Sequence, residues 1–145
     1  MAAIERSLVL VKPDAVRDGH GDEIINRLER LGLRILARKR LHMDKALAEK
    51  HYDIHRDKPF YAELVAYMTS APIVAAVFEG RGAVARIRQA MGATDPAKAE
   101  AGTIRADFGL SITRNAVHGS DSAATAEEEI RFFFTGDEIR SAGKR

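Results

Sequence analysis

The chain has 145 residues, 46% of them hydrophobic, so it is long enough to bury one core but too short for two. Its 23 basic and 21 acidic side chains leave a formal net charge of +2, which argues against a protein that coats nucleic acid. The absence of cysteine excludes disulfide frameworks, thiolate metal sites and cysteine nucleophiles. The longest early apolar run is shorter than a secretory signal or a membrane span, so we expect one cytoplasmic domain over residues 1–145.

A continuous apolar run from Leu8 to Val11 is typical of a central strand that is covered on both faces. The run stops at Lys12 and Pro13, so Lys12 is expected at the carboxyl end of this strand. Apolar residues then recur at helical spacing between Asp22 and Gly32, which predicts a helix.

The middle of the chain continues to alternate strand and helix patterns. Leu33, Ile35 and Ala37 alternate with arginines, the period of a half-exposed strand that runs into Met43. The following elements are then predicted in order: a helix capped by Asp44 through about Tyr52, a helix starting at Pro59 with Phe60, Leu64 and Met68 on one face, a strand over 73–78, and a helix ended by Gly92.

The segment from Ala93 to about Asn115 sustains no helical period, and a loop of that length in a compact domain is usually functional or disordered. A short strand over 116–118 and a helix over 120–133 complete the chain. This order, with helices that cover the strands, predicts a ferredoxin-like α/β sandwich.

Two familiar ligand motifs fit poorly. The stretch from Gly80 to Ala85 matches G-x-G-x-x-A after a strand, but the parallel strand with an acid that a dinucleotide fold needs next is missing. His51 and His55 have the spacing of a zinc-binding pair, yet tyrosine stands at position 52 where a metalloprotease has its acid. No clear third ligand is visible, so a solvated or structural role is favoured for both histidines.

His118 is a stronger candidate, because it ends a short strand beside Gly119 and just before a helix N-terminus that favours anions. A neutral imidazole there can attack phosphorus, provided that a partner fixes its tautomer. Glu129 shares the inward helix face of Ala126 and Ile130, and a carboxylate buried there must find a donor. From these residues alone, an ordinary strand-to-helix turn with an acid satisfied by a cap stays an alternative.

The segment Asn115-x-x-His118-Gly119-Ser120-Asp121 resembles the active-site signature of nucleoside diphosphate kinases. The resemblance covers nearly the whole chain and includes these further stretches: 10–16, 23–25, His51-Tyr52, Pro59-Phe60, 93–96 and 102–108. Agreement on both sides of the long loop rules out a chance local match.

The resemblance implies a ferredoxin-like α/β sandwich with a mainly antiparallel four-stranded sheet and a long functional loop at about 92–115. It also implies a ping-pong transfer of the γ-phosphate of a nucleoside triphosphate to a nucleoside diphosphate through phosphorylated His118. Glu129 and Ser120 match the pair that orients the ring, and Lys12 is expected to take part in catalysis. The residues implied in nucleotide binding are Lys12, Tyr52, His55, Phe60, Leu64, Arg88, Thr94, Arg105, Ile112 and Asn115. Mg²⁺ is expected to be held by the nucleotide phosphates and water, with no direct protein ligand.

A site that holds the nucleobase by stacking on its π-face should discriminate poorly between bases, because every base has such a face. Broad base specificity and a role in maintaining triphosphate pools are therefore expected. The resemblance also implies a homo-oligomer, with a hexamer favoured over a tetramer or dimer. Asp95 stands where asparagine is frequent, Ala106 where glycine is common, and the chain ends soon after Phe134. These departures affect the expected assembly rather than catalysis.

Two other functions compete with this interpretation. A catalytically silent nucleotide-binding module is disfavoured by the retention of His118 and Glu129 together with the expected phosphate-binding residues. A nucleic-acid-binding regulatory protein would use the basic residues at 34, 38, 39 and 40, but these fit a solvated strand edge better. Neither nucleic acid nor a membrane is an expected partner.

Overall fold

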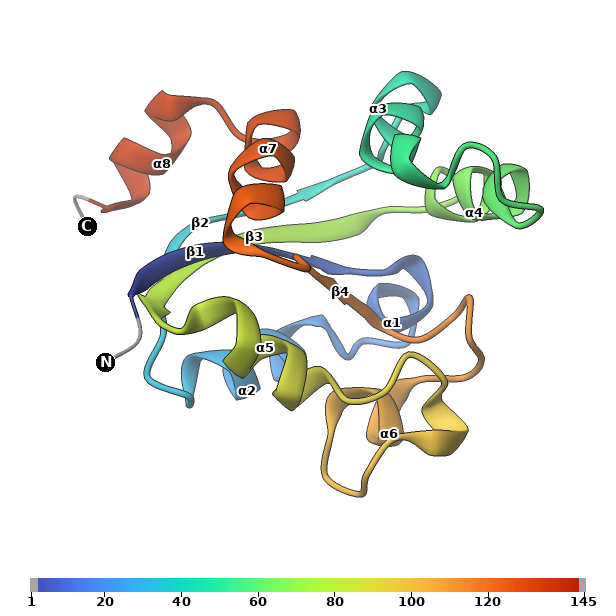
Figure 1. The fold of residues 1–145 in the computed structure, drawn as a ribbon, viewed down its shortest axis with the longest axis horizontal. Coiled ribbons are helices and arrows are strands. Elements are labelled where there is room, and N and C mark those ends of the chain that lie inside the picture. Colours follow the sequence, from blue (N-terminus) through green and yellow to red (C-terminus); the bar gives the residue numbers. More distant parts are fainter. Residues whose placement is uncertain (1–2, 144–145) are drawn as a thin grey trace.

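A four-stranded antiparallel sheet with strand order β2-β3-β1-β4 forms the centre of the fold, and helices cover both of its faces (Figure 1). The computed structural model describes residues 3–143, and side chains as far as residue 139. The elements in chain order are β1 (Ile4–Val11), α1 (Pro13–Arg17), α2 (Gly21–Glu29), β2 (Arg34–Leu41), α3 (Lys45–His51), the 3₁₀ turn η1 (Asp53–His55), α4 (Tyr61–Met68), β3 (Ile73–Arg81), α5 (Ala83–Met91), η2 (Pro96–Lys98), α6 (Ile104–Phe108), β4 (Val117–Gly119), α7 (Ala123–Phe133) and α8 (Gly136–Gly143).

The central strand β1 is buried on both faces, as its apolar run predicts. Leu8 and Leu10 pack in one hydrophobic cluster with side chains of α3, α4 and α7. Val9 and Val11 pack in a second cluster with side chains of α2, α5 and α6. The two layers lie on opposite sides of the sheet in Figure 1. The predicted α/β sandwich with an antiparallel four-stranded sheet is confirmed.

The alternation predicted for the second strand is wrong beyond its start. The pairing of β2 with β3 shifts register between Ile35 and Ala37, and Leu36 and Ala37 are both buried. A bulge of this kind gives one strand an extra residue, so an alternating pattern changes face at that point. The strand also ends at Leu41, before the predicted Met43.

Helices α1, α6 and α8 lie where the sequence predicts none, and α6 falls inside the expected loop. Helices α1 and α6 have five residues each, too few to show a helical period in the sequence. Helix α6 is stabilised instead by an N-cap and by packing: Thr103 Oγ1 accepts from the Ala106 N–H at 3.3 Å, and Ile104 is buried. Helix α4 begins at Tyr61 rather than at Pro59.

No helix among residues 3–143 combines the length and the apolar character that crossing a bilayer requires.

Candidate active site

His118 is presented by β4, the short edge strand, where it pairs with Leu10 of β1. Backbone hydrogen bonds hold the strand at both ends. The Lys12 N–H donates to Ala116 O at 2.8 Å, and the Ser120 N–H donates to Leu8 O at 3.1 Å. The imidazole therefore projects from a backbone that is fixed to the centre of the sheet.

Glu129 of α7 reaches His118 through the Nε2 atom of the ring. Nε2 lies 3.2 Å from Glu129 Oε2 and 3.4 Å from Oε1, and the two side chains are 24% and 9% exposed. Ser120 Oγ accepts from the Leu8 N–H at 3.0 Å and donates to Glu129 Oε1 at 2.7 Å. Sequence reasoning paired these three residues, and the structure brings them together.

The carboxyl of Glu129 is favoured in its ionised form. Burial opposes ionisation, but hydrogen bonding and charge from His118, with smaller contributions from His51 and Ser120, lower the pKa below its ordinary value. An ionised carboxylate favours a proton on Nε2 of His118, which leaves Nδ1 unprotonated in the neutral ring.

Two buried cations, Lys12 and Arg105, lie beside the histidine. Lys12 Nζ donates to Thr113 O at 2.6 Å and to Asn115 Oδ1 at 3.0 Å. Arg105 donates from Nη2 to Val117 O at 2.8 Å. Burial lowers the pKa of Lys12 to about 8, which Asp14 opposes and Arg105 reinforces, and burial lowers the pKa of Arg105 to about 10, reinforced by the charge of Arg88.

These contacts also tie the long loop to the sheet. Arg105 of the loop donates from Nη2 to Val117 O of β4, and within the loop Asn115 Nδ2 donates to Thr94 O at 3.0 Å and Arg105 Nη1 donates to Gly92 O at 3.1 Å. The loop that the sequence marks as functional therefore packs its polar residues against β4, next to His118.

A third cation is exposed and already paired. Arg88 Nη1 of α5 lies 2.7 Å from Asp121 Oδ1, with side-chain exposures of 45% and 71%. A surface pair of this kind is weak, so a phosphate can displace the carboxylate from the guanidinium at little cost.

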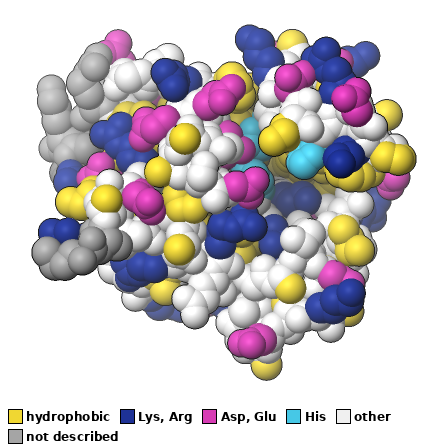
Figure 2. Space-filling view, in the orientation of Figure 1, with side chains coloured by type: hydrophobic (Ala, Val, Ile, Leu, Met, Phe, Trp, Pro, Cys, Tyr) yellow, Lys and Arg dark blue, Asp and Glu magenta, His cyan; other side chains and the backbone are white. Residues whose placement is uncertain are grey.

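All of these elements surround a cavity of about 710 Å³. Each of the ten residues expected to bind nucleotide lines it, as do His118 and Glu129. Ser120 does not line the cavity, because it is fully buried behind Glu129. Figure 2 shows histidine and basic side chains gathered at a hollow on this face.

One side of the cavity is apolar. Phe60, Leu64 and Ile112 line it, and Phe60 and Ile112 are 46% and 60% exposed. The His55 ring lies 5.5 Å from the Phe60 ring, between centroids. Exposed apolar side chains at a cavity mouth, with cations deeper inside, suit a ligand with one flat apolar end and one anionic end.

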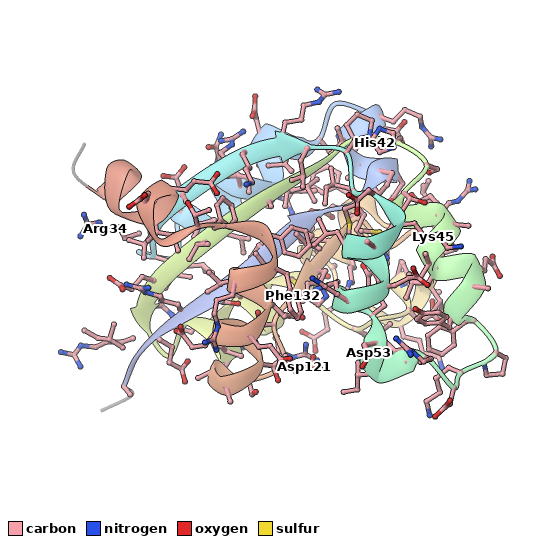
Figure 3. The ribbon with its side chains drawn as sticks, turned by 90° about the horizontal axis from the view of Figure 1, so that it is seen from above. Arg34, His42, Lys45, Asp53, Asp121 and Phe132 are labelled. Atoms are coloured by element: carbon pink, nitrogen blue, oxygen red, sulfur yellow. The ribbon has the colours of Figure 1, made fainter. Side chains whose placement is uncertain are left out.

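Further cavity residues carry no role from the sequence. Asp53 of η1, Asp121 just before α7 and Phe132 near the end of α7 lie around the opening between α7 and the α3–η1 segment (Figure 3). Asp121 falls inside the sequence signature, but only the structure shows its bond to Arg88. His51 also lines the cavity, and the sequence favoured a solvated or structural role for it.

Gly119 lines the cavity, in agreement with a role in ligand approach, but it is also needed for packing. A Cβ atom at this position would lie 2.9 Å from Met91 Sδ and 3.2 Å from a side-chain carbon of Ile87. Glycine therefore lets α5 approach β4 closely, an explanation that the sequence did not reveal.

The sequence disfavours His51 and His55 as a zinc-binding pair, and His55 is not part of the group of metal-ligating side chains found in the described residues. Within residues 3–139, the one group of three metal-ligating side chains is His51, His118 and Glu129, whose ligand atoms lie within 4.8 Å of one another. Two imidazoles and one carboxylate do not suit Mg²⁺, which prefers oxygen ligands.

The whole chain resembles one known family. The family model described as nucleoside diphosphate kinase matches residues 5–139. A nucleoside diphosphate kinase of Dehalococcoides mccartyi is 54% identical over 142 residues, covering 98% of this chain and all of the relative.

Solved structures agree with the sequence comparison. The nucleoside diphosphate kinase of Aquifex aeolicus superposes with a TM-score of 0.92 at 43% identity, over 94% of this chain and 99% of that one. The halophilic enzyme of Halobacterium salinarum, solved in complex with CDP, gives 0.91 at 45% identity, over 94% and 91% of the two chains. The chain belongs to the nucleoside diphosphate kinase family, and it is a phosphotransferase of that family.

Proposed function

We propose that the reaction proceeds through a phosphoryl group carried on Nδ1 of His118. The observation that supports this assignment is the engagement of the opposite ring nitrogen, Nε2, by Glu129. Nδ1 attacks the γ-phosphorus of a nucleoside triphosphate, the bond to the β-phosphate oxygen breaks, and a nucleoside diphosphate leaves. A second diphosphate then attacks the phosphohistidine through its terminal oxygen and restores the neutral ring.

Glu129 and Ser120 serve as the pair that orients the ring. Phosphorylation makes the imidazole cationic, and a carboxylate next to Nε2–H stabilises that charge as it develops. Ser120 holds one carboxylate oxygen and is itself fixed by the backbone of β1.

Lys12, Arg88 and Arg105 provide positive charge for the phosphates, and Thr94, Asn115, Tyr52 and His55 complete the lining around them. In-line phosphoryl transfer requires positioning and charge more than covalent chemistry, so three cations around one histidine suit it. A bound phosphate would replace Asp121 as the partner of Arg88.

The apolar side of the cavity holds the base. Phe60, Leu64 and Ile112 offer surfaces for stacking and contact, which every base can use. Nucleoside triphosphates and diphosphates of all common bases are therefore the proposed substrates. The CDP bound to the Halobacterium salinarum relative supports a nucleotide in this place.

Mg²⁺ is proposed to arrive with the nucleotide. Among the described residues that line the cavity, Glu129, Asp121 and Asp53 are engaged with His118, Arg88 and Arg56, and Glu128 is a further, exposed carboxylate. This donor set fits an ion held through phosphates and water. Mg²⁺ neutralises part of the charge on the phosphates that the lysine and arginines contact.

A homo-oligomer, with a hexamer favoured over a tetramer or dimer, is part of the proposal, as are a cytoplasmic location and a role in maintaining triphosphate pools. Light scattering of the purified chain would decide the assembly. The basic residues of β2 are not proposed to bind nucleic acid, because Arg38 pairs with Asp22 and Lys39 with Glu138.

A coupled assay of Mg²⁺-ATP with GDP, CDP, UDP and dTDP tests the proposed activity. We expect transfer to all four diphosphates with comparable kcat/KM. A protein that binds these nucleotides but forms no triphosphate would be the silent module instead. Omission of Mg²⁺ in the presence of EDTA should abolish transfer.

A further inference from the structure

His51 is a buried polar group without a hydrogen-bond partner. Its side chain is 1% exposed, and neither Nδ1 nor Nε2 has a partner within the part of the chain that the structure describes. Buried polar atoms in proteins are nearly always paired, so an unpaired one calls for an explanation, and a catalytic role is one such explanation.

The His51 ring packs against aromatic side chains, and its Nδ1 atom lies close to Glu129, the partner of His118. It makes edge contacts with the rings of Tyr52, His118 and Phe133 at centroid distances of 4.5, 4.8 and 5.3 Å. Its Nδ1 atom lies 3.7 Å from Glu129 Oε2, just beyond hydrogen-bond distance.

His51 is neutral at physiological pH. Burial lowers its pKa to about 3, and the charges of His118 and His55 add to that effect while Glu129 opposes it. A neutral imidazole has one N–H, and a carboxylate 3.7 Å from Nδ1 favours that proton on Nδ1.

A metal ion explains the unpaired nitrogens less well. A tetrahedral zinc ion with bonds of about 2.1 Å needs ligand atoms roughly 3.4 Å apart. The ligand atoms of His51, His118 and Glu129 lie up to 4.8 Å apart, so the side chains would have to move closer together to bind one ion. A hydrogen bond requires a much smaller shift.

We propose that His51 is a positioning residue, whose Nδ1–H donates to Glu129 Oε2 when His118 is phosphorylated. This inference rests on the proposed function. Ser120 already fixes Oε1 of the carboxylate, whereas the hydrogen-bond partner of Oε2 among the described residues is the catalytic ring. A second donor would fix both oxygens, so that the carboxylate faces Nε2 as the ring gains positive charge.

Two substitutions separate a donor from a packing residue. In His51→Asn the amide nitrogen can occupy the place of Nδ1, but the ring contacts are lost. In His51→Phe the ring contacts remain, but the donor is lost. A donor role and a packing role therefore predict opposite orders of activity for these two variants.

The measurement is single-turnover labelling with γ-labelled ATP and Mg²⁺, at several ATP concentrations. For His51→Phe we expect the saturating rate to fall about 10- to 100-fold, the usual loss when a supporting hydrogen bond is removed. The half-saturating ATP concentration should stay within about twofold. His51→Asn should stay within about threefold of the wild-type rate, because the donor is kept.

A His51→Phe rate equal to or above that of His51→Asn would overturn the proposal, as would equal losses or no loss in the two variants. Labelling of the wild-type protein tests the proposed function separately, because a wild-type protein that takes up no label would refute the phosphohistidine intermediate itself.

The unaltered protein gives a second test of the His51 proposal, one that needs no variant to fold. With ¹⁵N-labelled histidine, the His51 proton is expected on Nδ1, and a proton on Nε2 would refute the assignment.

Discussion

Asp14 Oδ2 accepts a hydrogen bond of 3.0 Å from the backbone N–H of Ala116, two residues before His118. Ala116 has φ of 76°, and it is the one non-glycine residue among 3–143 with a positive φ. This conformation costs a non-glycine residue about 1–3 kcal/mol and persists only where neighbours enforce it. Asp14 is itself buried and accepts from the Tyr67 hydroxyl at 2.6 Å.

Asp14→Ala should therefore lower the free energy of unfolding by about 2–3 kcal/mol, because two donors lose their acceptor. Asp14→Asn keeps an acceptor for Ala116 and should cost less than about 1 kcal/mol. Urea denaturation measures both values. Equal stabilities for the two variants would show that the carboxylate does not hold this turn.

The lowered pKa of Lys12 predicts a loss of activity in alkali. Only the protonated amine attracts phosphate, so kcat/KM should begin to fall above about pH 7, reach about half near pH 8 and approach a tenfold loss per pH unit beyond that. In Lys12→Arg the charge persists in alkali, so the fall of kcat/KM at high pH should disappear even if the overall rate is lower. A wild-type profile that stays flat to pH 9.5 would contradict the assignment.

Phe60→Ala should weaken the binding of purine and pyrimidine diphosphates by similar factors, on the order of 1–3 kcal/mol for a lost stacking contact. Leu110→Ala is a matched control, since Leu110 is 61% exposed and does not line the cavity. Isothermal titration with ADP, GDP and CDP measures the losses. A large effect confined to one base would indicate recognition of the base edge.

His51 also predicts how stability depends on pH. Its folded-state pKa lies below the ordinary value of 6.5, so the unfolded chain binds the proton more readily. The stabilisation is present above about pH 6.5 and is lost progressively as the pH falls toward 3. From pH 7 to pH 5 this one group should remove about 2 kcal/mol of unfolding free energy.

His51→Gln should reduce that acid sensitivity, because the group that titrates is removed. Denaturant unfolding at both pH values measures the difference. The same loss in wild type and His51→Gln would exclude His51 as the cause.

The sequence predicted those parts of the fold in which one period is sustained. The apolar run of β1 and the inward stripe of α7 identified the sheet centre and placed Glu129 toward the interior. Helices α1 and α6 were missed because five residues show no period, and their stability comes from caps and packing. The bulge after Ile35 was missed because an extra residue in a strand has no marker in an alternating pattern.

The residues of the site, too, were only partly predictable from the sequence. The expected nucleotide-binding residues came from a resemblance along the chain, and the structure places them around one space. The turn at Ala116 and the unpaired ring of His51 did not follow, because alanine has no preference for positive φ and burial arises from packing between distant segments. These features depend on contacts that no local pattern specifies.

The most direct test of the histidine mechanism is the isolation of the intermediate. Incubation of the protein with γ-labelled ATP and Mg²⁺ alone should place label on His118, in a form that is stable in alkali and lost in acid. Added GDP should discharge it as labelled GTP, and His118→Gln should take up no label although it still binds nucleotide. Parallel double-reciprocal lines at several fixed ATP concentrations are the expected kinetic result. Intersecting lines together with an unlabelled protein would show direct transfer between two bound nucleotides and contradict the role assigned to His118.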